Sequence, residues 1–518
     1  MSKTDLVWVL VAFAVYMLGM LLIGFSFMRK TKNTEDYFLG GRGLGKWVAA
    51  LSAQASDMSG WLLMGLPGTV YALGTGQSWI AIGLFLGTVC NWLFISTRLR
   101  RYTIRANNSL TLPEYFENRF HDKRRILLIA SSIVIVIFFV VYTASAFAAG
   151  GKMFNIVFGV DYRIALTIGV VVILGYTFMG GFMAVCTTDF IQGLLMLVGL
   201  MTVPILCYVF VGPANLTDIL AQTNVTGGVD SYLNIFHNGG KPFGFIDIIS
   251  QIGWGLGYCG MPHILVRFMA VKSEKELKQS RIIAIVWVAV SLFFGCFIGI
   301  IGRAYLFPTI LGTETTGSAE NVFINMIVQL FTKDIRIPFI GGIFLCGILA
   351  AIMSTADSQL LVAASSASED LYKGVINPKA KDKNVLLLSR IIVVCIAAIA
   401  YFIAWDPNSS IMGLVSNAWA GLGAAFGPTV LMSLYWKRAN LGGAIAGIVS
   451  GGLTVIIWDY IPLVNGQTLG TVTGLYSLVI GFAVSLALIV VVSLLTKAPS
   501  TEMLQEFEDV RSGKMELE

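Results

Sequence analysis

The sequence predicts an all-α membrane protein that crosses the lipid bilayer thirteen times. Three observations predict this fold class: 56% of the 518 residues are hydrophobic, only 12% are charged, and the mean hydropathy is +0.79. Soluble proteins carry roughly 25% charged residues, and a charged side chain is costly inside hydrocarbon. The shortage of charge therefore indicates a chain that lies largely within a membrane.

Each predicted span is an apolar run of about 20 residues, which is the length that a helix needs to cross the hydrocarbon core. The first run is followed, not preceded, by its basic cluster, which is unlike a cleaved signal peptide, so we expect it to be retained. A shorter apolar segment, 321–332, is expected to form a helix within a loop. The predicted spans are 6–26, 47–72, 78–97, 126–150, 163–186, 190–211, 244–270, 282–302, 337–366, 387–404, 411–435, 442–461 and 474–496.

The distribution of lysine and arginine predicts an outside N-terminus and a cytoplasmic C-terminus. With this orientation, all but seven of the 35 basic residues lie on the cytoplasmic side, as the positive-inside rule requires. The orientation also needs an odd number of spans, in agreement with thirteen. The net charge of +6 is thus explained by topology, and we expect no nucleic-acid partner. The seven outside residues are Lys3, Lys152, Arg163, Lys241, Arg303, Lys333 and Arg336.

The second and seventh predicted spans contain residues that interrupt a helix. The second holds Asp57, three serines, Gly60 and Pro67, and the seventh holds four glycines between Gly253 and Gly260 before Pro262. Glycine and proline weaken helices, and non-helical backbone persists in a bilayer only where it lines a cavity or is buried in protein. Close helix packing is an alternative reason for the glycines, but it does not explain an acid at mid-span.

The two interrupted spans lie five spans apart, so they run in opposite directions through the membrane. This arrangement predicts two inverted repeats, each opening with a broken helix, with binding sites where those helices unwind. We therefore expect six regions along the chain. They are the first helix and its cytoplasmic loop (1–46), a first repeat (47–211), an outside loop (212–243), a second repeat (244–436), two C-terminal helices (437–497) and a cytoplasmic tail (498–518).

Candidate site residues gather near the two breaks. Ser354 and Thr355 are adjacent hydroxyls in an otherwise apolar span; they could ligate a cation together with freed carbonyls, or could bond within their own helix. Trp61, Tyr142, Trp254 and Tyr258 would suit a small apolar ring, and core packing or interface anchoring is the alternative.

Three sequence features argue against an enzyme. A match to the dinucleotide fingerprint, from Gly255 to Gly260, lies inside a membrane span and lacks the strand and helix that it requires. The three histidines form no cluster along the sequence, and the seven cysteines fall in apolar runs with no metal or redox spacing. We expect no catalytic residues and no organic cofactor.

Several stretches, including Ala53–Gly68 and Gly253–Tyr258 around the two breaks, resemble the sodium:solute symporter family, and within it the bacterial branch that carries proline. The resemblance covers nearly the whole chain. The matching stretches are Asp36–Arg42, Ala53–Gly68, Leu110–Phe116, Tyr176–Ala184, Gly253–Tyr258, Pro262–Met269, Leu349–Thr355 and Ala418–Pro428.

The resemblance implies a LeuT-like core of two inverted five-helix repeats that couples import of L-proline to Na+ in the bacterial cytoplasmic membrane. Membrane lipid is an expected partner, and a monomer is one of the oligomeric states that the sequence leaves open. The implied Na+ ligands are the carbonyls of Ala55, Met58 and Ala351 and the hydroxyls of Ser354 and Thr355, with Asp57 needed for coupling. The solute would lie near Ser59, Gly60, Trp61, Tyr142, Trp254 and Tyr258, and Arg42 would act in gating or coupling.

A second cation or proton site would involve Asp189, Asp357 and Ser358. Asp357 departs from the usual residue of the proline branch, and two close carboxylates need a cation or proton between them. The alternative is that Asp357 faces a cytoplasmic water cavity, while Asp189, placed at the inside end of the fifth span, caps the next helix.

Two other function classes compete with proline import. The first is Na+ symport of another small solute, such as another amino acid, a sugar or a carboxylate. The second is a channel or a membrane sensor, against which the paired broken helices and the absence of a soluble domain in the sequence both argue.

Overall fold

The structure is a computed structural model that describes residues 1–28, 34–177, 181–312 and 319–513. The basic cluster after the first span and residues 178–180 of the matching stretch Tyr176–Ala184 lie outside these ranges. The long helices are α1 (Lys3–Met28), α3 (Lys46–Asp57), α5 (Ser78–Cys90), α8 (Ile126–Phe158), α9 (Tyr162–Thr177), α10 (Phe182–Val211), α15 (Glu274–Tyr305), α17 (Pro338–Ser365), α18 (Asp382–Ile403), α19 (Ile411–Tyr435), α20 (Leu441–Tyr460), α22 (Ser477–Leu495) and α23 (Thr501–Ser512).

The short elements complete the chain. They are α2 (Thr34–Leu39), α4 (Leu66–Leu73), α6 (Ser96–Arg105), α7 (Leu112–Arg119), α11 (Leu216–Gln222), α12 (Gly228–Tyr232), α13 (Phe245–Ile252), α14 (Pro262–Met269), α16 (Val322–Gln329), α21 (Leu469–Thr473), and the strands β1 (His237–Asn238) and β2 (Lys241–Pro242).

Helices occupy all thirteen predicted spans. In the described part of the chain, nine continuous helical runs are individually long and apolar enough to cross a membrane. The other four predicted spans correspond to α3 with α4, to α9, to α13 with α14, and to α19. The fold is therefore that of a polytopic helical membrane protein, while the number of thirteen crossings stays a prediction. The loop helix predicted at 321–332 is α16, extended by a π-helical turn, Leu330–Asp334.

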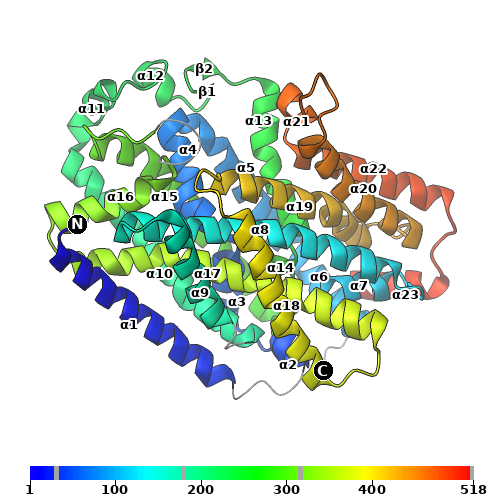
Figure 1. Cartoon of the computed structure of the whole chain (residues 1–518). Helices are drawn as coiled ribbons and strands as arrows, with labels where there is room; N and C mark the ends of the chain where they lie inside the picture. The colour runs from blue at the N-terminus through cyan, green and yellow to red at the C-terminus, as the bar shows by residue number, and fades with distance from the viewer. Residues whose placement is uncertain (29–33, 178–180, 313–318, 514–518) are drawn as a thin grey trace.

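Apolar side chains cover much of the outer surface, as contact with lipid requires. On α1, for example, Val15, Leu18 and Leu22 are each about three-fifths exposed, whereas Ala12 and Met20 are buried. Figure 1 shows α1, in blue, along one flank of the bundle and α20 and α22, in orange to red, at the opposite flank. The broken helices pack against α17 and α19.

The boundary between the fifth and sixth spans differs from the prediction. Helix α9 ends at Thr177 and α10 already begins at Phe182, so the predicted spans 163–186 and 190–211 divide the apolar run at the wrong place. Gly181 precedes α10 in an extended conformation, and a side chain there would lie only 3.0 Å from the ring of Tyr37. Asp189 therefore lies well inside α10. It neither ends the fifth span nor caps the following helix.

Two segments predicted as loop or tail contain helices. Between residues 212 and 243, α11, α12 and the β1–β2 hairpin cover α4, where the Tyr232 hydroxyl donates to the Val70 carbonyl oxygen at 3.0 Å. In the tail, α23 buries Met503, Phe507 and Val510. The Glu506 carboxylate lies 3.1 Å from Nε2 of His121, which ties the tail to the segment after α7.

Candidate functional site

The first helix break follows Asp57. Met58 leaves the helical conformation (φ −80°, ψ 77°), and the chain resumes as a π-helical turn, Trp61–Gly65, before α4. The indole Nε1 of Trp61 donates to the Asp57 carbonyl oxygen at 2.9 Å, so it satisfies one carbonyl that the break leaves without its helical partner. At Gly60 an added Cβ would lie 2.7 Å from the Cβ of Ala149 on α8. Gly60 thus lets the break pack directly against α8.

The second break lies between α13 and α14. Residues Gly253–Gly260 form a 3-10 helix, and Met261 (φ −78°, ψ 107°) is extended before α14 begins at Pro262. A Cβ on Gly257 would collide with the indole of Trp419 on α19. That indole donates to the carbonyl oxygen of Trp254 at 2.8 Å. Only glycine at position 257 lets the second break pack this closely against the Trp419 indole.

A hydrogen bond joins the two breaks. The Tyr258 hydroxyl donates to Oδ2 of Asp57 at 2.5 Å. Asp57 is fully buried, and its Oδ1 has no hydrogen-bond partner among the described residues. Burying a charged oxygen without a partner is costly. Oδ1 is therefore a buried acceptor that a cation or a donor group could satisfy.

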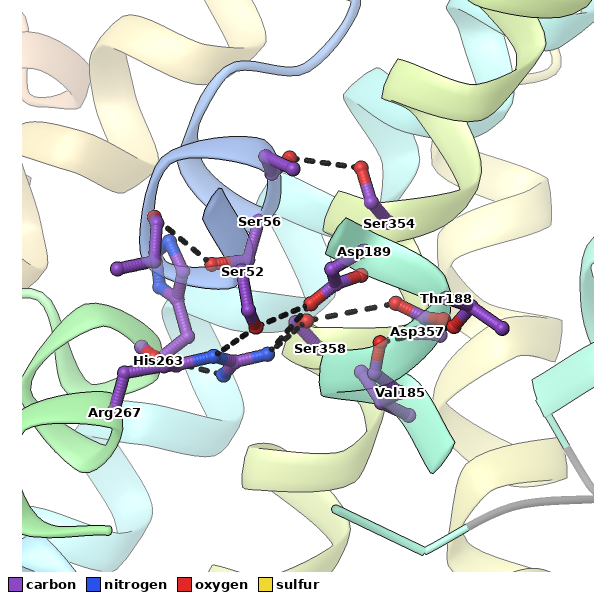
Figure 2. A network of polar contacts seen from close by, with 12 residues as sticks. Ser52, Ser56, Val185, Thr188, Asp189, His263, Arg267, Ser354, Asp357 and Ser358 are labelled. Carbon is purple, nitrogen blue, oxygen red and sulfur yellow. Dashed lines mark hydrogen bonds and ion pairs between the residues drawn. The ribbon is translucent and has the colours of Figure 1, made fainter. Parts of the chain in front are cut away.

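The predicted hydroxyl pair on α17 reaches the first break. Ser354 Oγ donates to the Ala55 carbonyl oxygen at 2.8 Å and lies 3.1 Å from the Ala351 carbonyl oxygen, and Thr355 Oγ1 lies 3.4 Å from the same Ala55 oxygen. Figure 2 shows Ser354 pointing from its helix toward the turn of α3. The alternative, a bond from Ser354 to a carbonyl of its own helix, is thus present at 3.1 Å, but its contact with Ala55 on α3 is shorter, at 2.8 Å. Four of the five predicted ligand residues converge here, and Met58 follows Asp57 at the break.

The predicted aromatic residues are buried around the breaks, but they differ in what they contact. The indole of Trp254 stacks on Tyr476, with ring centroids 5.1 Å apart and an interplanar angle of 19°. The ring of Tyr258 lies edge-on to Trp419 at 5.1 Å. Tyr142 is fully buried, and its hydroxyl has no partner among the described residues. Beside them, Ser59 Oγ accepts from the backbone N–H of Trp61 at 3.3 Å.

A second polar cluster surrounds Arg267 on α14, a residue that the sequence reasoning did not single out. Its guanidinium Nη2 donates to Asp189 Oδ2 at 3.2 Å and to Ser358 Oγ at 2.6 Å. Its Nε lies 3.1 Å from Ser52 Oγ, which in turn donates to Asp189 at 2.7 Å. Figure 2 shows these groups meeting between α3, α10, α14 and α17.

The remaining member of that cluster is Asp357. Its Oδ1 lies 3.5 Å from Ser358 Oγ, and its Oδ2 has no partner in the described part of the chain. The predicted grouping of Asp189, Asp357 and Ser358 is therefore present, with a guanidinium group among its members. An arginine inside a predicted membrane span was a signal available in the sequence.

Arg42 lies apart from both clusters and fastens the chain before α3. Its guanidinium donates to the carbonyl oxygens of Met269 at 2.6 Å and of Ser109 at 3.0 Å, and to Asn108 Oδ1 at 2.8 Å. Burial, with a smaller effect from the like charge of Arg100, lowers the pKa of Arg42 to about 10. Arg42 therefore stays charged at neutral pH while it joins the ends of α6 and α14 to the start of α3.

A buried ion pair that the sequence reasoning also missed lies at the other end of the bundle. Lys152 Nζ on α8 lies 2.7 Å from Glu320 Oε2. Glu320 Oε1 accepts from the backbone N–H of Ile411 at 3.0 Å, at the start of α19. Lys152 follows the predicted span 126–150 directly, so the sequence places it in a loop outside the membrane. Its partner Glu320 is distant in the sequence and is identified only by the fold.

A symporter of known structure shares this fold. A solved Na+-coupled sialic acid symporter shares this fold with a TM-score of 0.75 at 20% sequence identity, over 95% of this chain and 99% of that one. The fold is thus that of the LeuT-like Na+ symporters. The sequence profile described as "Sodium:solute symporter family" matches residues 37–451, and the chain belongs to this family.

Relatives align along nearly the whole chain. A sodium/proline symporter of Escherichia coli (strain K12) is 45% identical over 96% of this chain and 95% of its own length. A protein of Bacillus subtilis (strain 168) named high-affinity proline transporter PutP is 45% identical over 95% of this chain and 98% of its own. A sodium/proline symporter of Staphylococcus aureus is 43% identical over 96% of this chain and 94% of its own length.

Proposed function

We propose that the protein imports L-proline together with Na+ across the bacterial cytoplasmic membrane by alternating access. The observation that carries this proposal is the meeting of both broken helices at one buried carboxylate, Asp57, beside the hydroxyls of α17. Proline is the proposed solute because relatives that align over nearly the whole chain are named for it. The N-terminus lies outside and the C-terminus in the cytoplasm, in keeping with the positive-inside rule.

The proposed Na+ site combines neutral oxygens with one nearby charge. The carbonyls of Ala55, Met58 and Ala351 and the hydroxyls of Ser354 and Thr355 supply oxygen ligands. The Ala55 oxygen accepts from Ser354 Oγ at 2.8 Å, so a hydroxyl hydrogen must turn away before the ion is bound. Asp57 balances the positive charge within a low-dielectric interior.

Binding of Na+ at this place joins α17 to the broken helix of the first repeat. We assign 47–211 and 244–436 to the two inverted repeats, so the ion links an element of each. The broken helix of the first repeat, α3, also carries Asp57, whose hydrogen-bond partner Tyr258 lies on the second break. Na+ thereby favours one arrangement of both breaks, which is how ion binding can raise the affinity for solute.

The proposed solute site lies where Ser59, Gly60 and Trp61 leave the first break and face Tyr142, Trp254 and Tyr258. Apolar rings suit the compact ring of proline, while unpaired polar groups such as the Tyr142 hydroxyl suit its charged end. Arg42 secures the cytoplasmic approach, since it joins three segments that must move when that side opens.

For the second cation site we propose that the resident cation is the Arg267 guanidinium and not a second Na+. Arg267 and Asp189 are both fully buried and form an ion pair at 3.2 Å, and Ser358 completes the contact. One Na+ per proline follows from this assignment. Reversal potentials in proteoliposomes that give a ratio of two, lowered to one in Asp357→Ala, would contradict it.

The test is uptake of labelled L-proline into proteoliposomes, with unlabelled amino acids, sugars and carboxylates as competitors. We expect Na+-dependent uptake that only proline and close analogues suppress. Stronger competition by glucose or an unrelated carboxylate would favour a symporter of the same family for another solute. Uptake that saturates without Na+ would overturn the proposal.

A further inference from the structure

His263 is a fully buried histidine whose ring has no hydrogen-bond partner in the part of the chain that the structure describes. It follows Pro262 in the first turn of α14, directly after the second break. Neither ring nitrogen has a partner within the described residues. A neutral imidazole carries one N–H donor and one acceptor, and buried polar groups are rarely left unpaired. The ring can therefore offer both a donor and an acceptor to a polar group of a bound ligand.

The surroundings of the ring point to the solute site. Its centroid lies 6.2 Å from that of Tyr142 and 5.6 Å from that of Phe139, both edge-on and both on α8. The Tyr142 hydroxyl is likewise buried and unpaired. A contact of the imidazole N–H with an aromatic face is the competing explanation, but such contacts are weak and leave the tyrosine hydroxyl without a partner.

The electrostatics around His263 favour a negatively charged partner. The ring lies at the N-terminal end of α14, where the helix dipole attracts anions. The Arg267 guanidinium, one turn further along, donates to the His263 carbonyl oxygen at 2.8 Å, and Figure 2 shows the imidazole pointing away from that guanidinium group. The opposite break carries the buried acid Asp57. An amino-acid zwitterion would thus lie with its ammonium group toward Asp57 and its carboxylate toward α14.

We propose that His263 is a specificity-determining residue of the solute site, whose ring N–H donates a hydrogen bond to the carboxylate of the bound amino acid. This inference rests on the proposed function and adds to it the orientation of the solute. Tyr142 lies beside the same carboxylate, so two neighbouring side chains without a partner among the described residues recognise one end of the ligand.

The test compares binding of L-proline and of L-prolinamide, which lacks the carboxylate charge, by calorimetry on the full-length protein in Na+. A hydrogen bond to a charged group corresponds to about tenfold to 100-fold in affinity. We expect His263→Phe to weaken proline binding by about tenfold or more and to leave prolinamide nearly unchanged, because only proline has a charged acceptor that loses the N–H donor of His263. His263→Gln, which keeps an N–H donor, should retain most of the affinity.

Two controls separate this inference from packing and from the proposed function itself. His237→Phe, in the outer loop, should leave both affinities unchanged, and the Na+ dependence should stay the same in every variant. Equal losses for proline and prolinamide in His263→Phe, or no loss, would overturn the inference. If His263→Phe does not fold, His263→Leu takes its place. Failure of the wild-type protein to bind proline would instead refute the proposed function.

Discussion

Removal of the two α17 hydroxyls should abolish most of the response to Na+. In Ser354→Ala/Thr355→Val, both hydroxyl ligands are lost while valine keeps the volume of threonine. With about 1.5 kcal/mol for each contact to a charged group, the loss is about 3 kcal/mol, or about 100-fold in apparent Na+ affinity. The Ala55 carbonyl also loses its partners, which costs about 1–3 kcal/mol in folding stability.

Thermal unfolding in detergent separates these two effects. Na+ at 100 times its dissociation constant stabilises the wild-type protein by about 2.7 kcal/mol, whereas a 100-fold weaker site gains about 0.4 kcal/mol at the same concentration. The matched control is Ser368→Ala, a buried serine that follows α17 and whose hydroxyl bonds within the helical run, to the Ala364 carbonyl oxygen at 2.7 Å. It should keep the full Na+ stabilisation. A double variant that keeps the wild-type Na+ dependence would refute this ion site.

Three further predictions address the neighbouring groups. Asp57→Asn should abolish Na+-stimulated proline uptake in a protein that still reaches the membrane, because the neutral amide no longer balances the cation; near-normal uptake at low Na+ would contradict this. Trp254→Ala should weaken proline binding by about 1–3 kcal/mol, the loss expected for a buried apolar contact, as measured by calorimetry. Arg267→Met should destabilise the protein by about 3–5 kcal/mol, because it leaves buried Asp189 without its cation, and Arg267→Met/Asp189→Asn should recover part of that loss; equal thermal stability of the two variants would count against the ion pair.

The sequence predicted the positions of the apolar helices well because length and hydropathy identify such helices. The error between the fifth and sixth spans has a local cause. Apolar residues continue from Phe182 to Cys186, so hydropathy alone gives no signal for the turn before them. Gly181, which packs on Tyr37, is the residue that marks it, and one pair of glycines, Gly180 and Gly181, is a weak signal in an apolar run.

The helix breaks were predictable, whereas the partners across them were not. Asp57 and the glycines of the seventh span are unusual residues for a bilayer, so their positions alone indicated a site. The hydrogen bond between Tyr258 and Asp57 joins residues 201 positions apart, and no local pattern encodes it. The same holds for the insertion of Arg267 between Asp189 and Ser358, which depends on the packing of three separate helices.

The central claim, that a Na+ gradient drives proline import, is tested most directly by accumulation in proteoliposomes. Labelled L-proline is supplied outside, and the initial rate and the final internal concentration are measured with an inward Na+ gradient or with K+ replacing Na+. We predict that proline accumulates above its external concentration only with the inward Na+ gradient and that the accumulation collapses when a Na+ ionophore is added. Equal final concentrations inside and outside under the Na+ gradient would contradict the account.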